Sequence, residues 1–337
     1  MQVKPRYFVL SLLAVSLGLG LAGCGQPDAS KSSGTASQVA STASPTVEKS
    51  ALHEQEIAKL TANTVPINTA KNPAAIAKIP HDYKFVNEGY FTVAAITGLP
   101  PLSVLAPDNK TDIGTEVDFA RLIADSLGLK LKLVRTSWED WPLGVSSGKY
   151  DAAISNITVT KERKEKFDFA TYRRDVLAFY VADKSSIQQI KGPDDIAGLK
   201  IVVGSGTNQE KVLLDWIQDN KKKGLKPAEA LYYGDSASAS LALQSGRVDA
   251  IFGPNVAYAW QAVNGAKIRS VGTALGGGTR PADLGVTLKK GTGLVDAVQV
   301  AINGFIKTGE YQQVLNRWGT QAEALEQSQI NPPGLGD

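Results

Sequence analysis

The chain has 337 residues, of which 43% are hydrophobic and 20% charged, with 32 Gly, 16 Pro and a single Cys. This composition excludes a fibrous or wholly disordered chain, and one cysteine excludes a miniprotein stapled by disulfides. At roughly 150 residues per domain, the length predicts about two domains that each bury a core. A formal charge of +3 is too small for a nucleic-acid-binding surface, so no nucleic acid is expected as a partner.

The N-terminus has the features of an export signal. Lys4 and Arg6 precede an apolar run over residues 7–21, which is short for a membrane span of about 20 apolar residues. The run ends in Leu-Ala-Gly-Cys, which resembles the lipobox of bacterial lipoproteins. The resemblance implies that the thiol of Cys24 carries diacylglycerol after cleavage; the alternative is a signal peptide with an incidental cysteine.

The segment after Cys24 lacks the pattern of a folded element. Of the 17 residues from 30 to 46, 12 are Ser, Thr or Ala, and no apolar period is present. Burial cannot offset the entropy cost of ordering such a segment. We therefore assign residues 1–23 to a signal peptide and residues 24–80 to a flexible tether, and we expect the folded body to begin near His81.

From Phe91 onward, short apolar strands alternate with amphipathic helices, the pattern of an α/β protein with mostly parallel sheets. The first series predicts strands over residues 91–96, 129–133 and 151–155, with helices over residues 115–127 and 141–147. A second series begins near Leu199 with a strand over residues 201–203. This strand runs into Gly204-Ser-Gly-Thr-Asn208 and then a helix.

The two series also repeat in sequence. Residues 143–154 match residues 241–252 at an offset of 98, with five of twelve positions identical. Helix–glycine–strand junctions look alike in any α/β protein, which is the alternative explanation of this match. The repeat predicts two related lobes, and a cleft between two lobes is a common ligand site.

From about Tyr90 to Trp318 the chain resembles the extracytoplasmic solute-binding proteins of polar amino-acid ABC transporters. The strongest similarity is SGKYDAAISNITVTKERK at residues 147–164, followed by FDFA at residues 167–170. Further matching segments lie at residues 114–120, 198–203 and 309–318. The resemblance implies a two-lobed periplasmic-binding-protein fold, with two parallel-rich α/β sheets and a hinge of two crossing strands.

The resemblance also implies the limits of the lobes. Lobe one would comprise residues 81–175 and 278–325, lobe two residues 176–277, and a C-terminal tail residues 326–337. The chain would cross near residues 172–176 and return near residues 273–283. The ligand would lie in the cleft and be enclosed by hinge closure.

In lobe one the resemblance assigns five ligand contacts: Arg163, Ser155, Asn156, Thr158 and Trp138. Arg163 would bind the ligand carboxylate, because a guanidinium fork can bind a carboxylate through two parallel hydrogen bonds. Trp138 would lie against the ligand side chain. From the residues alone, Arg163 would be part of a solvated run of charges, and Trp138 would pack with Trp141 on the lobe surface.

In lobe two the implied contacts are Ser205, Thr207, Asn208 and Gln209, where a strand ends and a helix begins. Free backbone N–H groups at such a helix start favour an anion. The alternative is a plain helix cap by Ser205 or Thr207. As a phosphate loop the segment is weak, because it lacks the Gly-Lys-Ser/Thr ending.

The sequence departs from the family where the ligand ammonium is usually held. An acidic residue commonly follows the first strand and another follows Phe252, but Ile96 and Pro254 stand there. Leu99 occupies a position that often holds an aromatic residue. These positions make Ile96, Leu99 and Asn255 expected ligand contacts without supplying a carboxylate.

An ammonium in a closed cleft needs acceptors, since burying an unpaired charge is costly. The sequence leaves several candidates open: Asn255, backbone carbonyls near Ile96, Glu139, Asp140 and Asp283. With few carboxylates in place, we expect weak binding of basic amino acids. Neutral or acidic amino acids, or a carboxylate without an ammonium, should bind better.

The resemblance implies an exported monomer, lipid-anchored to the outer face of the cytoplasmic membrane, that captures a small polar solute such as an amino acid. It would deliver the solute to the subunits of an ABC permease. No catalytic residue, cofactor or metal is expected. The only histidines, His53 and His81, precede the first predicted strand, which excludes histidine catalysis and a His-rich metal site, and Ile96 and Pro254 replace two carboxylates that could act as acid or base. A dehydratase-like enzyme on the same fold and a sensory solute-binding protein are the alternatives.

Overall fold

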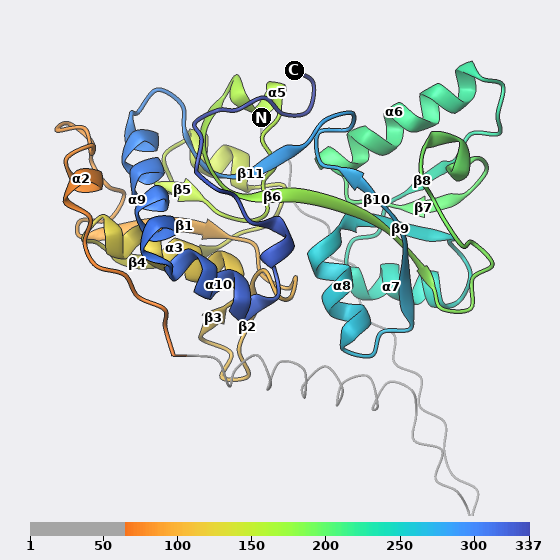
Figure 1. Ribbon diagram of the computed structural model, residues 1–337, viewed down its shortest axis with the longest axis horizontal. Helices are drawn as coiled ribbons and strands as arrows, with labels where there is room; N and C mark the ends of the chain where they lie inside the picture. The colour runs from red at the N-terminus through yellow and green to blue at the C-terminus, as the bar shows by residue number, and fades with distance from the viewer. Residues whose placement is uncertain (1–64) are drawn as a thin grey trace, which may run out of the picture. The chain divides into compact units, whose positions relative to one another are not determined.

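The computed structural model describes residues 65–337, which form an α/β fold with two lobes (Figure 1). The signal peptide, Cys24 and the tether up to residue 64 lie outside the described residues. Each lobe has its own hydrophobic core, and the sheets of the two lobes share one long strand.

Lobe one is built around β1 (Tyr90–Ala95), which pairs in parallel with β4 (Lys130–Arg135) and β5 (Ala152–Ala153). Five of the six residues of β1 are buried, as expected for a parallel strand covered on both faces. Three long helices contribute apolar residues to the main core of this lobe: α3 (Thr115–Ser126), α9 (Leu294–Thr308) and α10 (Glu310–Trp318). Four shorter elements lie between β1 and the crossing: β2 (Val104–Leu105), β3 (Asp112–Ile113), α4 (Trp141–Ser146) and α5 (Lys161–Lys164).

Lobe two repeats this plan. Its central strand β7 (Lys200–Val202) pairs in parallel with β8 (Glu229–Leu231) and β9 (Ala250–Pro254). Its helices are η1 (Pro193–Ile196), α6 (Asn208–Lys222), α7 (Ser236–Gln244) and α8 (Asn255–Val263). The core contains a stack of Phe179 and Phe252, whose ring centroids lie 4.1 Å apart, with Trp216 beside them.

One strand, β6 (Phe167–Ala182), runs through both lobes (Figure 1). Residues 167–175 pair antiparallel with β11 (Ala282–Lys289) of lobe one, and residues 176–182 pair antiparallel with β10 (Ile268–Leu275) of lobe two. The change of partner falls between Asp175 and Val176. The second crossing passes Gly276, where a Cβ atom would lie 2.4 Å from Oδ2 of Asp175, so only glycine fits.

The repeated segments, residues 143–154 and 241–252, make the same hydrogen bonds in their respective lobes. Asp151 donates its backbone N–H to the carbonyl of Thr92 and accepts the N–H of Thr92 on Oδ2, at 2.9 and 2.7 Å. Asp249 makes the same two bonds with Lys200, at 2.8 and 2.7 Å. In both lobes the aspartate follows a glycine of positive φ and locks the next strand to the start of the central one.

The folded body begins before His81, earlier than the sequence predicts. Helix α2 (Pro73–Ile76) is capped by the side chain of Asn72, which accepts hydrogen bonds from Ala74 N and Ala75 N. Ala75 is fully buried in the main core of lobe one, together with Ile67. These few apolar side chains attach the segment to lobe one, although it contains three prolines and no long apolar pattern.

The segment expected to be a C-terminal tail, residues 326–337, packs against both lobes. It follows η2 (Gln321–Glu323). The backbone of Leu335 bonds to Val159 and Lys161 of lobe one. Its side chain is 6% exposed and lies in the core of lobe two, together with Leu177 and Val212.

Candidate functional site

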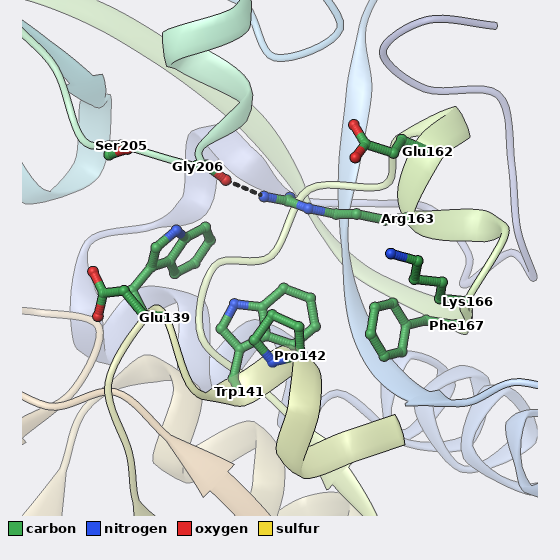
Figure 2. A pocket seen from close by; sticks show the side chains of 10 residues that line it. Glu139, Trp141, Pro142, Glu162, Arg163, Lys166, Phe167, Ser205 and Gly206 are labelled. Carbon is green, nitrogen blue, oxygen red and sulfur yellow. Dashed lines mark hydrogen bonds between the residues drawn. The ribbon is translucent and has the colours of Figure 1, made fainter. Parts of the chain in front are cut away.

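Arg163 lies at the meeting point of the two lobes. It belongs to α5, whose first turn is capped by the Thr160 hydroxyl accepting the N–H of Arg163 at 3.1 Å. The guanidinium donates to the carbonyl of Thr158 at 2.9 Å and, across the lobes, to the carbonyl of Gly206 at 3.2 Å (Figure 2). It also stacks over the rings of Trp138 and Trp141, 5.4 and 5.8 Å from their centroids.

The charge of Arg163 has no ionic partner in the described part of the chain. Burial lowers its pKa to about 10, against the smaller opposing effects of Asp175 and Glu162. No carboxylate of residues 65–337 forms an ion pair with it. A partly buried guanidinium that lacks a carboxylate partner is well suited to bind an anion from solution.

A pocket of about 360 Å³ surrounds this guanidinium (Figure 2). Lobe one supplies Trp138, Glu139, Trp141 and Pro142 at the start of α4, and Glu162, Arg163, Lys166 and Phe167 around α5. Lobe two supplies Ser205 and Gly206. The structure therefore brings three of the expected ligand contacts, Arg163, Trp138 and Ser205, to one pocket.

Two other expected contacts, Thr158 and Asn208, bind a buried carboxylate that the sequence analysis overlooked. Asp175 accepts the Thr158 hydroxyl and the Asn208 Nδ2 on its Oδ2 atom, each at 2.7 Å. Burial raises the pKa of Asp175, while the two donors and the nearby Arg173 and Arg163 oppose this rise. Thr158 belongs to lobe one and Asn208 to lobe two, so this carboxylate joins the lobes.

Asn156 points to a buried ion cluster. Its backbone has a positive φ of 54°, and its Oδ1 accepts from Arg173 at 2.9 Å. Arg173 is fully buried and pairs with Glu116 and Glu323. The sequence did not indicate this network, because its members are up to 207 positions apart and converge only in the fold.

The remaining expected contacts have local structural partners. Ser155 donates to the carbonyl of Ile154 and accepts the N–H of Ile96, at 2.6 and 2.9 Å. Thr207 caps α6 by accepting the N–H of Glu210 at 3.2 Å. Gln209 is buried in the first turn of α6, and Leu99 forms an isolated bridge with Ser103. Neither Gln209 nor Leu99 lines the pocket around Arg163.

Asn255 lies in a different pocket, of about 260 Å³, which includes Val176, Trp260, Thr320 and Glu323. Its Oδ1 accepts the hydroxyl of Tyr180 at 3.0 Å. The structure does not bring Asn255 to the pocket that contains Arg163.

The candidate carboxylates for an ammonium are also dispersed. Glu139 lines the pocket but is exposed to water. Asp140 accepts the hydroxyl of Ser137 at 2.9 Å, and Asp283 lies 3.7 Å from Arg174. The sequence did not point to Asp175 as a site residue, because its surroundings have the apolar pattern of a strand. The one indication was an acidic residue directly before the apolar run VLAFYV, where a buried charge is unusual.

Residues 65–337 contain no cluster of His, Cys, Asp and Glu that could ligate a metal ion. None of the helices in this range has the length and apolar character needed to cross a membrane.

The chain is similar in sequence to known solute-binding proteins. The family model of bacterial extracellular solute-binding proteins, family 3, matches residues 91–321. The L-cystine-binding protein TcyJ of Escherichia coli K12 is 31% identical over 220 residues, 65% of this chain and 78% of that protein. The arginine-binding protein ArgT of Corynebacterium glutamicum is 26% identical over 276 residues, 80% of this chain and 84% of that protein.

Solved structures show the same two-lobed fold. An ancestral arginine-binding protein bound to arginine is 26% identical with a TM-score of 0.59, covering 68% of this chain and 98% of that chain. The substrate-binding protein AbpA of Streptococcus pneumoniae, 24% identical, has a TM-score of 0.59 over 69% of this chain and 96% of that chain. The chain belongs to family 3 of the bacterial extracellular solute-binding proteins.

Proposed function

We propose that this protein binds an amino acid in the cleft between its lobes, with the solute carboxylate on Arg163, and delivers it to an ABC permease. Arg163 would exchange its bond to the Gly206 carbonyl for two parallel bonds to the carboxylate. The ring of Trp138 would cover the apolar part of the solute. Relatives named for binding L-cystine and arginine support an amino acid as the solute class.

The observation that carries this proposal is that the Arg163 guanidinium, at the meeting point of the lobes, has no carboxylate partner among residues 65–337. It is partly buried, it bonds to the opposite lobe, and its partners within residues 65–337 are carbonyl oxygens and aromatic rings. An incoming carboxylate would supply the missing negative charge at the point where lobe closure excludes water. A bidentate ion pair is strongest in such a place.

The test is calorimetry of Arg163→Ala with each common amino acid and L-cystine. Losing the charge pair should weaken binding by about 2–5 kcal/mol, or roughly 30- to several thousand-fold in affinity. Arg247→Ala is the matched control, because Arg247 is exposed on lobe two and does not line the pocket. Equal affinities of the wild-type protein and Arg163→Ala would refute the assignment.

We further propose that the protein binds without catalysis. The relatives are named as binding proteins, and among the ten residues that line the Arg163 pocket, Ser205 is the one hydroxyl and no histidine is present. Incubation with a bound amino acid followed by mass spectrometry should return the solute unchanged. A new product formed by the wild-type protein would favour the dehydratase-like alternative.

For the cellular location, we propose export and attachment to the outer face of the membrane through Cys24, with the monomer presented to the permease. A diacylated and N-acylated cysteine carries several chains, which gives a stable anchor where one chain does not. In the native host, Cys24→Ser should leave the membrane fraction. If the variant still partitions with membranes, the lipid anchor is not at Cys24.

A further inference from the structure

Two opposite charges, Arg163 in the pocket and the buried Asp175 outside the pocket lining, meet at Thr158 without pairing with each other. The carbonyl of Thr158 accepts from Arg163 at 2.9 Å, and its hydroxyl donates to Asp175 at 2.7 Å. Arg163 and Asp175 each affect the other electrostatically, yet no ion pair of the described residues joins them. A cation and an anion that share one neighbouring residue match an α-amino acid, whose carboxylate and ammonium sit on one carbon atom.

We propose that Asp175 accepts the ammonium group of the solute, an assignment that rests on the proposed binding of the solute carboxylate by Arg163. Ile96 and Pro254 stand where acidic residues were expected, so neither of these positions can neutralise an ammonium. An ammonium enclosed without an acceptor would lose its hydration without compensation, which opposes binding. Asp175 supplies that acceptor from the hinge strand β6.

The other carboxylates that the sequence left open are less suitable. The carboxylate of Asp283 already faces Arg174. Asp140 is exposed and accepts from Ser137. Glu139 lines the pocket but is also exposed, so water screens its charge. Asp175 is 3% exposed, and a charge–charge interaction is strongest where water is excluded.

Asp175 is also held in position by one donor from each lobe. Thr158 and Asn208 both donate to Oδ2, and neither bond uses Oδ1. The Asn208 amide is itself fixed by donating to the carbonyl of Gly276 at 3.0 Å. Hinge opening would separate the two donors and expose the carboxylate, and closure around a solute would rebuild the bridge with the ammonium as a third donor.

The experiment compares solutes that differ only in the ammonium group. L-Arginine is paired with 5-guanidinopentanoate, and L-cystine with 3,3′-dithiodipropionate, and binding is measured by calorimetry to the wild-type protein and to Asp175→Asn. Asp168→Asn is the control, because Asp168 lies in the same strand β6 and bonds to Gly291 and Asn331 away from the pocket. The wild-type protein should prefer the amino acid that it binds over its desamino partner by about 10- to 100-fold.

In Asp175→Asn, the preference for the amino acid over its desamino partner should fall to within about threefold. Asp168→Asn should keep the full preference. Equal loss of both members of a pair would show a purely structural role, and an unchanged preference would refute the proposal. The comparison within the wild-type protein stands even if Asp175→Asn fails to fold: equal binding of amino acid and desamino partner overturns the assignment.

A different result would show that Arg163 does not bind the solute carboxylate. If Arg163→Ala binds the desamino partners as well as the wild-type protein does, the Arg163 assignment is wrong whatever Asp175 does. If the desamino partners need Arg163 and the amino group adds nothing, only the Asp175 assignment is wrong.

Discussion

At the scale of single residues, the buried cluster of Arg173, Glu116 and Glu323 makes stability depend on pH. The pKa of Glu323 is raised from 4.5 to about 7, mainly because the carboxyl is buried; Asp175 and Glu116 add to the rise and Arg173 opposes it. The folded chain therefore holds this proton more tightly than the unfolded chain. The stabilisation from this group is complete below pH 4.5 and is lost as the pH rises through 7.

We predict that this carboxyl makes the free energy of unfolding fall by up to about 1.4 kcal/mol per pH unit between pH 5 and 7. Glu323→Gln cannot titrate, so its curve of unfolding free energy against pH should be flatter than that of the wild-type protein. Urea denaturation at several pH values measures both curves. Parallel curves would mean that Glu323 stays ionised in the folded protein, whatever the absolute loss of stability.

At the scale of elements, the C-terminal segment behaves as part of both lobes. Leu335→Ala should lower the free energy of unfolding by about 2–5 kcal/mol, because it empties a place in the core of lobe two. Leu241→Ala is the control, since Leu241 is 55% exposed and should change stability by less than about 0.5 kcal/mol. Urea denaturation of both variants decides this, and equal small losses would show that Leu335 does not contribute to that core.

The elements that could be predicted from the sequence are those with a strong local pattern. The apolar run at Phe91 and the amphipathic period after Thr115 correspond to β1 and α3. The repeat was informative because Asp151 and Asp249 make the same two hydrogen bonds in their lobes. Local patterns failed for α2 and for Leu335, where one or two apolar side chains attach an otherwise polar segment.

The candidate site was predicted less completely than the fold, for a physical reason. The resemblance identified Arg163, Trp138 and Ser205, which line one pocket. The directions of Asn156 and Thr158 are set instead by Arg173 and Asp175, charged residues buried in the crossing strand. A buried charge takes the nearest donors or acceptors that the fold offers, and no local pattern reveals which these will be.

At the scale of the whole molecule, hinge closure predicts that an amino acid bound between the lobes makes the protein more compact. The Arg163–Gly206 hydrogen bond is a single contact, worth on the order of 1 kcal/mol, and cannot hold the lobes closed alone. A solute that touches both lobes should select the closed state. Small-angle scattering should therefore give a smaller radius of gyration at saturating solute, and Arg163→Ala should show no such change.

The strand that runs through both sheets also bears on how the protein unfolds. Lobe one and lobe two have separate cores, and separate cores would ordinarily allow one to melt while the other persists. Here β6 supplies a row of backbone hydrogen bonds to β11 and another to β10, so neither half of the strand can leave without disturbing the other. Cooperativity is thus carried by the backbone rather than by a shared core, and the hinge is the region whose amides should be among the last to exchange with solvent.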